Sequence, residues 1–205
     1  MTIDEFDKYY IRRYTLLEND FLETVSYVSV EPENFNTYSQ KYLNLLLAIG
    51  SEVDLARKLL ANLINGCETK DKEVVSTIMN YDPEIKNLEV LYLEEGIKFK
   101  PWNYNECPEW RSVYTNVKHK RHYVAEKIDE NKTFFQCANL KNVLEALAGL
   151  HSLIFYIYFL MSKNDNTDHV PPIRCMFRIL NSHWAGIDYG SEVYFYNDSV
   201  IINTN

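Results

Sequence analysis

The sequence has little of several residue types, and each shortage excludes a class of protein. Only 6 Gly and 6 Pro occur among 205 residues, which excludes collagen-like, low-complexity and linker-dominated chains. The four cysteines form no C-x-x-C pair, so a zinc ribbon is excluded and a disulfide framework has no support. We therefore expect a cytoplasmic protein with reduced thiols at Cys67, Cys107, Cys137 and Cys175.

Positive charge is also scarce. Lys and Arg total 21 against 29 Asp and Glu, and the formal net charge is −8. Such a chain is a poor general binder of nucleic acid, because contacts to phosphate need a positive surface. Any activity of that kind must come from a local basic patch.

We expect neither a signal peptide nor a membrane span. The first seven residues are acidic, whereas a signal peptide begins with basic residues. The best membrane candidate, residues 143–161, is interrupted by Glu145, Gly149, His151 and Ser152. This segment predicts a buried helix in which His151 is a core residue.

Apolar and aromatic residues are abundant instead. Apolar residues make up 46% and charged residues 24%, values typical of a folded domain, and the length suits a single domain over residues 1–205. The chain contains 16 Tyr, so we expect Tyr hydroxyls to supply many of the hydrogen bonds of the core.

The spacing of apolar residues predicts five helices. From Phe6 to Val28, apolar residues recur at steps of three and four. Thr37 is the expected N-cap of the second helix, and Gly66 is the expected residue after its end. The expected ranges are 3–28, 37–66, 71–81, 108–122 and 133–162, with 129–132 as a polar connection.

Two other segments have the residue pattern of β-strands. Alternation next to Gly96 predicts a β-hairpin at about 89–101, and further β-type runs predict a C-terminal β segment at about 175–202. The expected fold class is therefore mainly α: a helical bundle at about 3–162 with a small appended antiparallel β-sheet (α+β). The second and fifth helices are the longest and most apolar, so they should form its centre.

A carboxylate interrupts the most apolar face of the second expected helix. At 100° per residue, Glu52 lies at the centre of a stripe of leucine and alanine side chains between Leu45 and Leu63. Burying a carboxylate is costly without a cation or hydrogen bonds. Glu52 is therefore either a site residue with a perturbed pKa or a structural polar contact. On the opposite face we expect an ion pair between Asp54 and Lys58.

The segment 110–122 is the densest cluster of functional side chains. Asn116 and His119, three residues apart, share one face of the expected helix, so their side chains can touch. His119 can then exchange a proton near neutral pH while Asn116 fixes its tautomer. The cations of this segment are the candidate phosphate- or partner-binding residues Arg111, Lys118, Lys120 and Arg121.

Structural explanations stay open for the same residues. Basic side chains near a helix C-terminus also complement the helix dipole. His119 and His122 form an H-x-x-H pair without a further assigned ligand, so we expect no metal site and no cofactor. Glu52, Asn116 and His119 can equally form a buried polar contact between helices.

The run Tyr114-Thr115-Asn116-Val117-Lys118-His119-Lys120-Arg121 resembles the Y-x-N-x-(I/V)-K-H-x-R-like helix of HEPN-type helical domains. Upstream, Tyr38-Ser39 and Ser51-Glu52-Val53-Asp54, with Lys58, resemble the acidic helix of that superfamily, so the similarity spans roughly residues 35–160. The resemblance implies a fold shared by metal-independent ribonucleases, toxins, phage-defence effectors and inactive binding modules. In active members, a His and an Arg from two protomers form a composite site on RNA phosphodiesters.

Two functions follow as alternatives. The favoured one is a non-enzymatic or regulatory HEPN-like module, possible as a homodimer, with a buried Glu52–Asn116–His119 site beside a basic patch that binds RNA or a protein. The other is an endoribonuclease in which His119 is the general base and Lys118 or Arg121 stabilises the phosphorane. The module is favoured because the Arg111-to-His119 spacing is longer than the family's. Both functions require Glu52 to meet His119.

Overall fold

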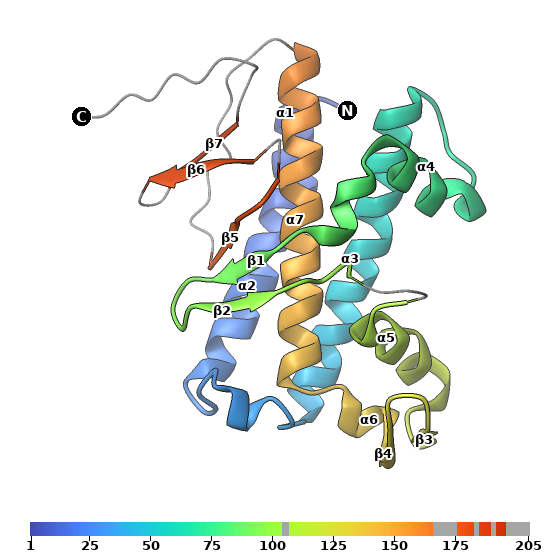
Figure 1. The fold of residues 1–205 in the computed structure, drawn as a ribbon, viewed down its shortest axis with the longest axis vertical. Helices are drawn as coiled ribbons and strands as arrows, with labels where there is room; N and C mark the ends of the chain where they lie inside the picture. The colour runs from blue at the N-terminus through green and yellow to red at the C-terminus, as the bar shows by residue number, and fades with distance from the viewer. Residues whose placement is uncertain (104–106, 166–175, 183–184, 190–191, 196–205) are drawn as a thin grey trace.

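The structure, a computed structural model, describes residues 1–103, 107–165, 176–182, 185–189 and 192–195. Helices pack around one central helix, and short antiparallel sheets lie beside it (Figure 1). This arrangement confirms the expected fold class, mainly α with a small antiparallel addition.

The α-helices are α1 (Ile3–Phe6), α2 (Arg12–Val25), α3 (Gln40–Asn65), α4 (Val74–Tyr81), α5 (Glu109–Lys120), α6 (Phe134–Cys137) and α7 (Leu140–Asp165). A π-helical turn, η1 (Asp7–Ile11), joins α1 to α2, and the 3-10 turns are η2 (Pro32–Asn34), η3 (Asp71–Glu73) and η4 (Pro83–Asn87). The strands are β1 (Val90–Tyr92), β2 (Ile97–Phe99), β3 (Val124–Ala125), β4 (Asp129–Thr133), β5 (Phe177–Ile179), β6 (Ala185–Tyr189) and β7 (Glu192–Phe195).

The two longest helices, α3 and α7, pack against each other at the centre of the bundle, as predicted. The hydroxyl of Ser39 accepts a hydrogen bond from the Tyr42 amide, so the N-cap of α3 lies two residues after the expected cap at Thr37. Its end at Gly66 is confirmed, because this residue has a φ of 67° that favours glycine.

Two predicted helices contain interruptions that their apolar spacing does not reveal. The first is continuous from Ile3 to Val25, but η1 inserts a π turn into it. The last begins where predicted, because Thr133 caps the short helix α6, but residues 129–132, expected as a polar connection, belong to β4, which pairs with β3. Asn139 then accepts a hydrogen bond from the amide of Asn142, so α7 starts separately.

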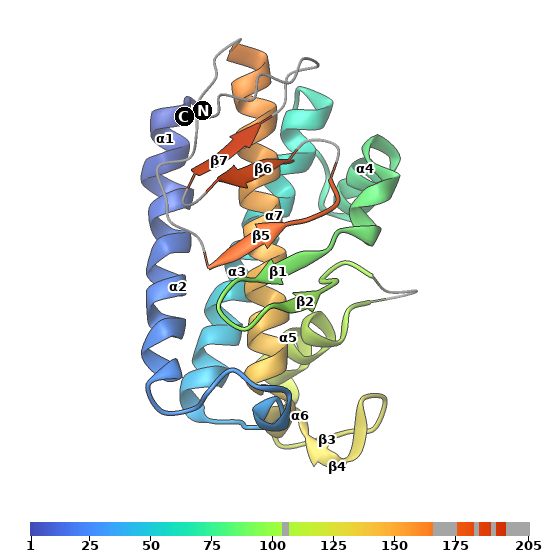
Figure 2. The same ribbon diagram turned by 60° about the vertical axis from the view of Figure 1, so that its left-hand side comes forward.

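The three-stranded sheet lies across α7 (Figure 2), in the antiparallel order β2-β1-β5. The predicted hairpin is confirmed, with Val90 opposite Phe99 and Gly96 in its turn at a φ of 68°. On the other side of β1, Tyr92 lies opposite Phe177 of β5. The predicted C-terminal β segment thus contains β5, β6 and β7, while its residues 175, 183–184, 190–191 and 196–202 lie outside the described part.

Helix α7 is buried almost throughout. By length and composition its residues 140–163 would suffice to cross a membrane, yet 89% of their most apolar window is buried within the fold. Neighbours on several sides cover it: α3, α5, the N-terminal helices α1 and α2, and strands β1 and β5. A core helix of this kind is what the interrupted apolar run predicts.

Helix α5 lies unusually close to α3. A Cβ atom at Gly50 would stand 2.3 Å from Cδ2 of the Tyr114 ring, far inside van der Waals contact. Glycine at this position therefore lets the Tyr114 ring lie directly on the backbone of α3. This contact is one of those that hold the basic segment on the bundle.

We predict that Gly50→Ala lowers the free energy of unfolding by about 1–3 kcal/mol, because the added methyl group overpacks the Tyr114 ring. Urea unfolding followed by circular dichroism measures the effect. The control is Ser51→Ala at the neighbouring exposed position, which should change the value by less than about 0.5 kcal/mol. A Gly50→Ala protein as stable as wild type would contradict the close packing.

Candidate functional site

The predicted basic residues gather at the C-terminal end of α5. All side chains of residues 118–122 are exposed, and we call them the basic cluster: Lys118, His119, Lys120, Arg121 and His122. Within the described part of the chain, none of them forms an ion pair with a carboxylate. The cluster therefore presents unneutralised positive charge on an acidic protein.

Aromatic rings accompany these cations. The Lys118 ammonium lies 3.6 Å from the centre of the Tyr114 ring, which fixes it near the helix surface. The rings of His122 and Tyr123 are 4.6 Å apart, and Tyr123 is 56% exposed. Tyr123 was not among the predicted site residues, although an aromatic residue directly after a run of cations is a recognisable signal for nucleic-acid contact.

The turn after α5 is attached to the fold by its backbone. The Phe135 amide donates to the carbonyl oxygen of Arg121 at 2.9 Å, and the Phe134 amide donates to that of Tyr123 at 3.0 Å. These two bonds connect the turn to the first residues of α6. The exposed side chains of the basic cluster thus project from a backbone whose course is fixed.

The predicted site of Glu52, Asn116 and His119 is not formed. Glu52 is paired with Arg13 of α2, with 3.2 Å between Nε and Oε1, whereas His119 is exposed on α5. Gly50, which contacts α5 through Tyr114, lies about 160° around α3 from Glu52. The two expected partners therefore lie on opposite sides of α3.

The helical wheel misplaced Glu52 for a physical reason. The most buried line of α3 passes through Leu46, Ile49, Val53 and Leu60, about 80° around the helix from Glu52. Leu59 and Leu63, which drew the expected stripe toward Glu52, are only half-buried. Glu52 lies at the edge of the core, where it reaches a cation.

The roles expected of Asn116 and Arg111 also change. Asn116 donates to the carbonyl oxygen of Ser112 at 2.9 Å, within its own helix, and no bond to His119 is among the described contacts. Arg111 is paired with Asp54 of α3 at 2.9 Å, and the Tyr114 hydroxyl donates to the same carboxylate at 3.0 Å. Arg111 therefore joins α5 to α3 and does not belong to the basic cluster.

The expected pair between Asp54 and Lys58 is wrong as well. Lys58 lies 2.6 Å from Asp71 instead and donates to the carbonyl oxygen of Thr69. It attaches the loop after α3 to that helix. Asp54 is therefore available to bind Arg111 and Tyr114 of α5.

Elsewhere in the core, a tyrosine hydroxyl joins a buried acid to a buried imidazole. The Tyr14 hydroxyl donates to Glu18 one turn further along α2, and it lies 2.9 Å from Nδ1 of His151 on α7. Because the phenol has one proton, its bond to Glu18 requires the Nδ1–H tautomer of His151. The Met176 amide, next to β5, also donates to Glu18, at 3.3 Å. Three distant segments share this contact.

Burial shifts both titratable groups toward their neutral forms. Loss of solvent raises the pKa of Glu18 to about 7, partly offset by its hydrogen bonds from Tyr14 and Met176. It lowers the pKa of His151 to about 3, and the burial of this side chain confirms the expected core histidine. Glu18 was missed, although its position four residues after Tyr14 on an apolar face was a usable signal.

The described residues contain no evident metal site. No group of three or more His, Cys, Asp or Glu side chains lies close enough together there to hold an ion.

The two shifts predict a distinctive pH dependence. The native state keeps the Glu18 proton up to about pH 7, so its contribution to the free energy of unfolding falls as the pH rises from 4.5. Native His151 stays neutral down to about pH 3, so its contribution falls as the pH drops below 6.5. Between pH 4.5 and 6.5 the two effects oppose each other.

We expect Glu18→Gln to remove the first effect alone. Between pH 4.5 and 7, the difference in unfolding free energy between variant and wild type should change by about 3 kcal/mol in favour of the variant. Urea unfolding at several pH values measures it, with the exposed Glu33→Gln as control. Parallel curves for Glu18→Gln and wild type would show that Glu18 is not the group responsible.

Comparisons with known proteins identify no relative. No family model, curated protein or solved structure matches this chain. The resemblance to HEPN-type domains therefore stays a prediction, and the site must be interpreted from its own residues. What those residues offer is an exposed cationic turn with an aromatic ring and a fully buried acid–phenol–imidazole contact.

Proposed function

We propose that this protein is a non-enzymatic, HEPN-like helical module that binds single-stranded RNA through the basic cluster and Tyr123. The observation that carries the proposal is the exposure of five basic side chains without a carboxylate partner in the described chain. Cations so placed can each contact a phosphate.

Charge distribution supports a local and selective contact. The net charge of −8 repels a polyanion from most of the surface, so attraction is confined to the end of α5. The same cations lie where the helix dipole is negative, which stabilises them there. The dipole accounts for their position on the helix; phosphate binding accounts for why no acid accompanies them.

Tyr123 favours an unpaired strand over a duplex. Its ring is more than half exposed and stands beside the His122 ring, so a base can stack on it. Bases within a duplex are already stacked and do not offer their faces. A single-stranded segment can place a base on Tyr123 and the adjoining phosphates on Lys120 and Arg121.

A non-enzymatic role fits the surroundings of His119. A general base needs a group that orients its ring, and Glu52, the expected partner, is bound to Arg13 on the other side of α3. The endoribonuclease alternative keeps one favourable observation: the His119 imidazole is exposed next to Lys118 and Lys120. An assay must therefore separate binding from cleavage.

This function needs no cofactor and suits the cytoplasm, where RNA is present. A homodimer, which the resemblance implies, would carry two basic clusters and raise the affinity for a strand long enough to reach both.

We predict that Lys120→Gln/Arg121→Gln weakens binding of a fluorescein-labelled single-stranded RNA at least about 10-fold. Fluorescence anisotropy over a range of salt concentrations measures it. The slope of log affinity against log salt should fall by about 1.4, since each lost phosphate contact removes about 0.7. Tyr123→Leu should weaken binding at least about five-fold and leave that slope unchanged.

The matched control is Lys70→Gln/Lys72→Gln, which removes two exposed cations from the loop around η3. It should bind RNA as wild type does. Equal losses in both double variants, or no binding by wild type at low salt, would overturn the proposal.

The same RNA distinguishes the module from the enzyme. After prolonged incubation with wild-type protein in the presence of EDTA, gel electrophoresis should show intact RNA. Cleavage by wild type that disappears in His119→Ala would replace the binding module by the metal-independent nuclease.

A further inference from the structure

A second exposed aromatic ring lies near the turn that carries the basic cluster. Tyr38, in the loop between η2 and α3, is 45% exposed, compared with 56% for Tyr123. Its backbone forms an antiparallel bridge with Asn139, directly before α7. Tyr38 is therefore held next to α6, which lies together with β3 and β4 at one end of the bundle (Figure 1).

The first two residues of α6 connect Tyr38 to the basic cluster. The amide of Phe135 donates to the carbonyl oxygen of Arg121 at 2.9 Å, and the ring of Phe135 packs edge-on against the Tyr38 ring, with centres 5.6 Å apart. The amide of Phe134 donates to the carbonyl oxygen of Tyr123 at 3.0 Å. A path over the start of α6 thus leads from one exposed tyrosine to the other.

Two contacts orient the Tyr38 side chain. Its ring lies at 79° to that of Phe135, and its hydroxyl accepts a hydrogen bond from Nε2 of Gln136 at 3.4 Å. Edge-on packing of this kind covers at most one face of the Tyr38 ring. A ring that is already oriented loses little entropy when a flat group stacks on its other face.

The neighbourhood of Tyr38 supplies an aromatic face without adding net positive charge. Lys132 of β4 donates to the side-chain oxygen of Asn36 at 2.9 Å and forms an ion pair with Asp129 at 3.1 Å. Its charge is therefore already balanced. Contacts to phosphate are left to the basic cluster, and Tyr38 can contribute stacking alone.

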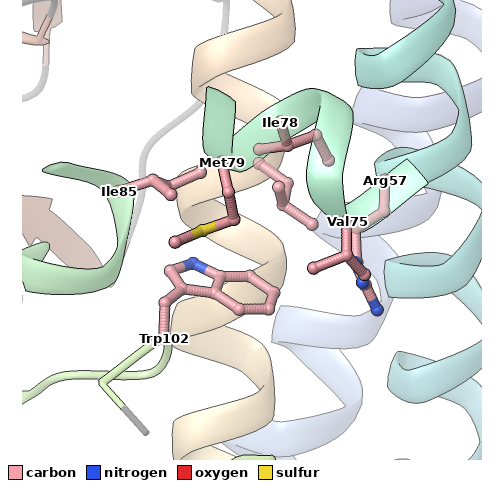
Figure 3. Close-up of a pocket in the computed structure, with 7 residues that line it drawn as sticks. Arg57, Val75, Ile78, Met79, Ile85 and Trp102 are labelled. Atoms are coloured by element: carbon pink, nitrogen blue, oxygen red, sulfur yellow. The ribbon is translucent and has the colours of Figure 1, made fainter. Parts of the chain in front are cut away.

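Two other aromatic side chains lack this combination of exposure and position. Trp102 is buried, and Figure 3 shows the Met79 side chain over its indole, so no base can reach that ring. Tyr81 is 52% exposed, but it ends α4, which lies well away from α6 in both views of the fold (Figure 2).

We propose that Tyr38 is a second stacking site for RNA, so that one strand places a base on Tyr123 and another on Tyr38 as it crosses the start of α6. This inference rests on the proposed RNA binding and specifies its substrate class. A strand that uses both rings must offer two separate unpaired bases, so the site selects an extended unpaired segment over a single flipped or terminal nucleotide.

The test is fluorescence anisotropy with a fluorescein-labelled uridine decanucleotide. Tyr38→Leu should weaken binding at least about five-fold and leave the slope of log affinity against log salt unchanged, because stacking is lost and phosphate contacts are kept. Inorganic polyphosphate carries charge but no bases. Its affinity, measured by displacement of the labelled RNA, should stay within about two-fold of the wild-type value.

Tyr38→Trp gives a second, independent signal. Indole offers a stacking face as phenol does, so this variant should bind the RNA at least as tightly as wild type, and its added tryptophan fluorescence should be quenched by the stacked base. The matched controls are Tyr81→Leu and Tyr81→Trp, at a similarly exposed position away from α6. They should bind as wild type does, without quenching of the added indole.

Wild-type affinity in Tyr38→Leu, or no quenching in Tyr38→Trp, would overturn the second stacking site. The proposed RNA binding would still stand if Lys120→Gln/Arg121→Gln lost affinity in the same assay. An equal loss of affinity for polyphosphate and RNA in Tyr38→Leu would also overturn it, because Tyr38 would then not act through bases. Absence of RNA binding by wild type would overturn both proposals.

Discussion

Enclosure of α7 is the constraint on which the rest of the structure depends. Because this helix is apolar nearly all round, other elements must cover it on several sides. Three of its polar side chains each bind a different neighbour: Asn142 binds Glu109 of α5, Ser152 binds Trp102, and His151 binds Tyr14 of α2. Non-directional burial is thus combined with directional contacts that define where each neighbour lies.

The buried His151 and the exposed His119 have different roles. His151, without solvent, stays neutral and serves the fold together with Tyr14 and Glu18. His119, on the surface, is available to ligands but has no orienting acid among the described contacts. The predicted contact between Glu52 and His119 is wrong, and the acid and imidazole that the core does bring near each other are joined through the Tyr14 hydroxyl.

Local signals made much of the fold predictable. The helix end at Gly66, the end of α4 at Tyr81 and the extent of α5 follow from residues within a few positions. The π turn, the pairing of β1 with β5 and the partner of Glu52 depend on distant packing that periodicity does not contain. The basic cluster could be predicted because a run of consecutive charged residues lies at the surface whichever element packs nearby. Its link to Glu52 failed because a wheel gives an angle within one helix and not the element that faces it.

The backbone bond from Met176 to Glu18 joins residues 158 positions apart. During synthesis the ribosome releases the N-terminal helices long before β5 exists, so Glu18 gains its last donor only after residue 176 has been added. Strand β1 pairs early with β2 in its own hairpin, but its other edge has no partner until β5 has been made. Translation thus sets an order in which the helices assemble first and the late-emerging strand seals them.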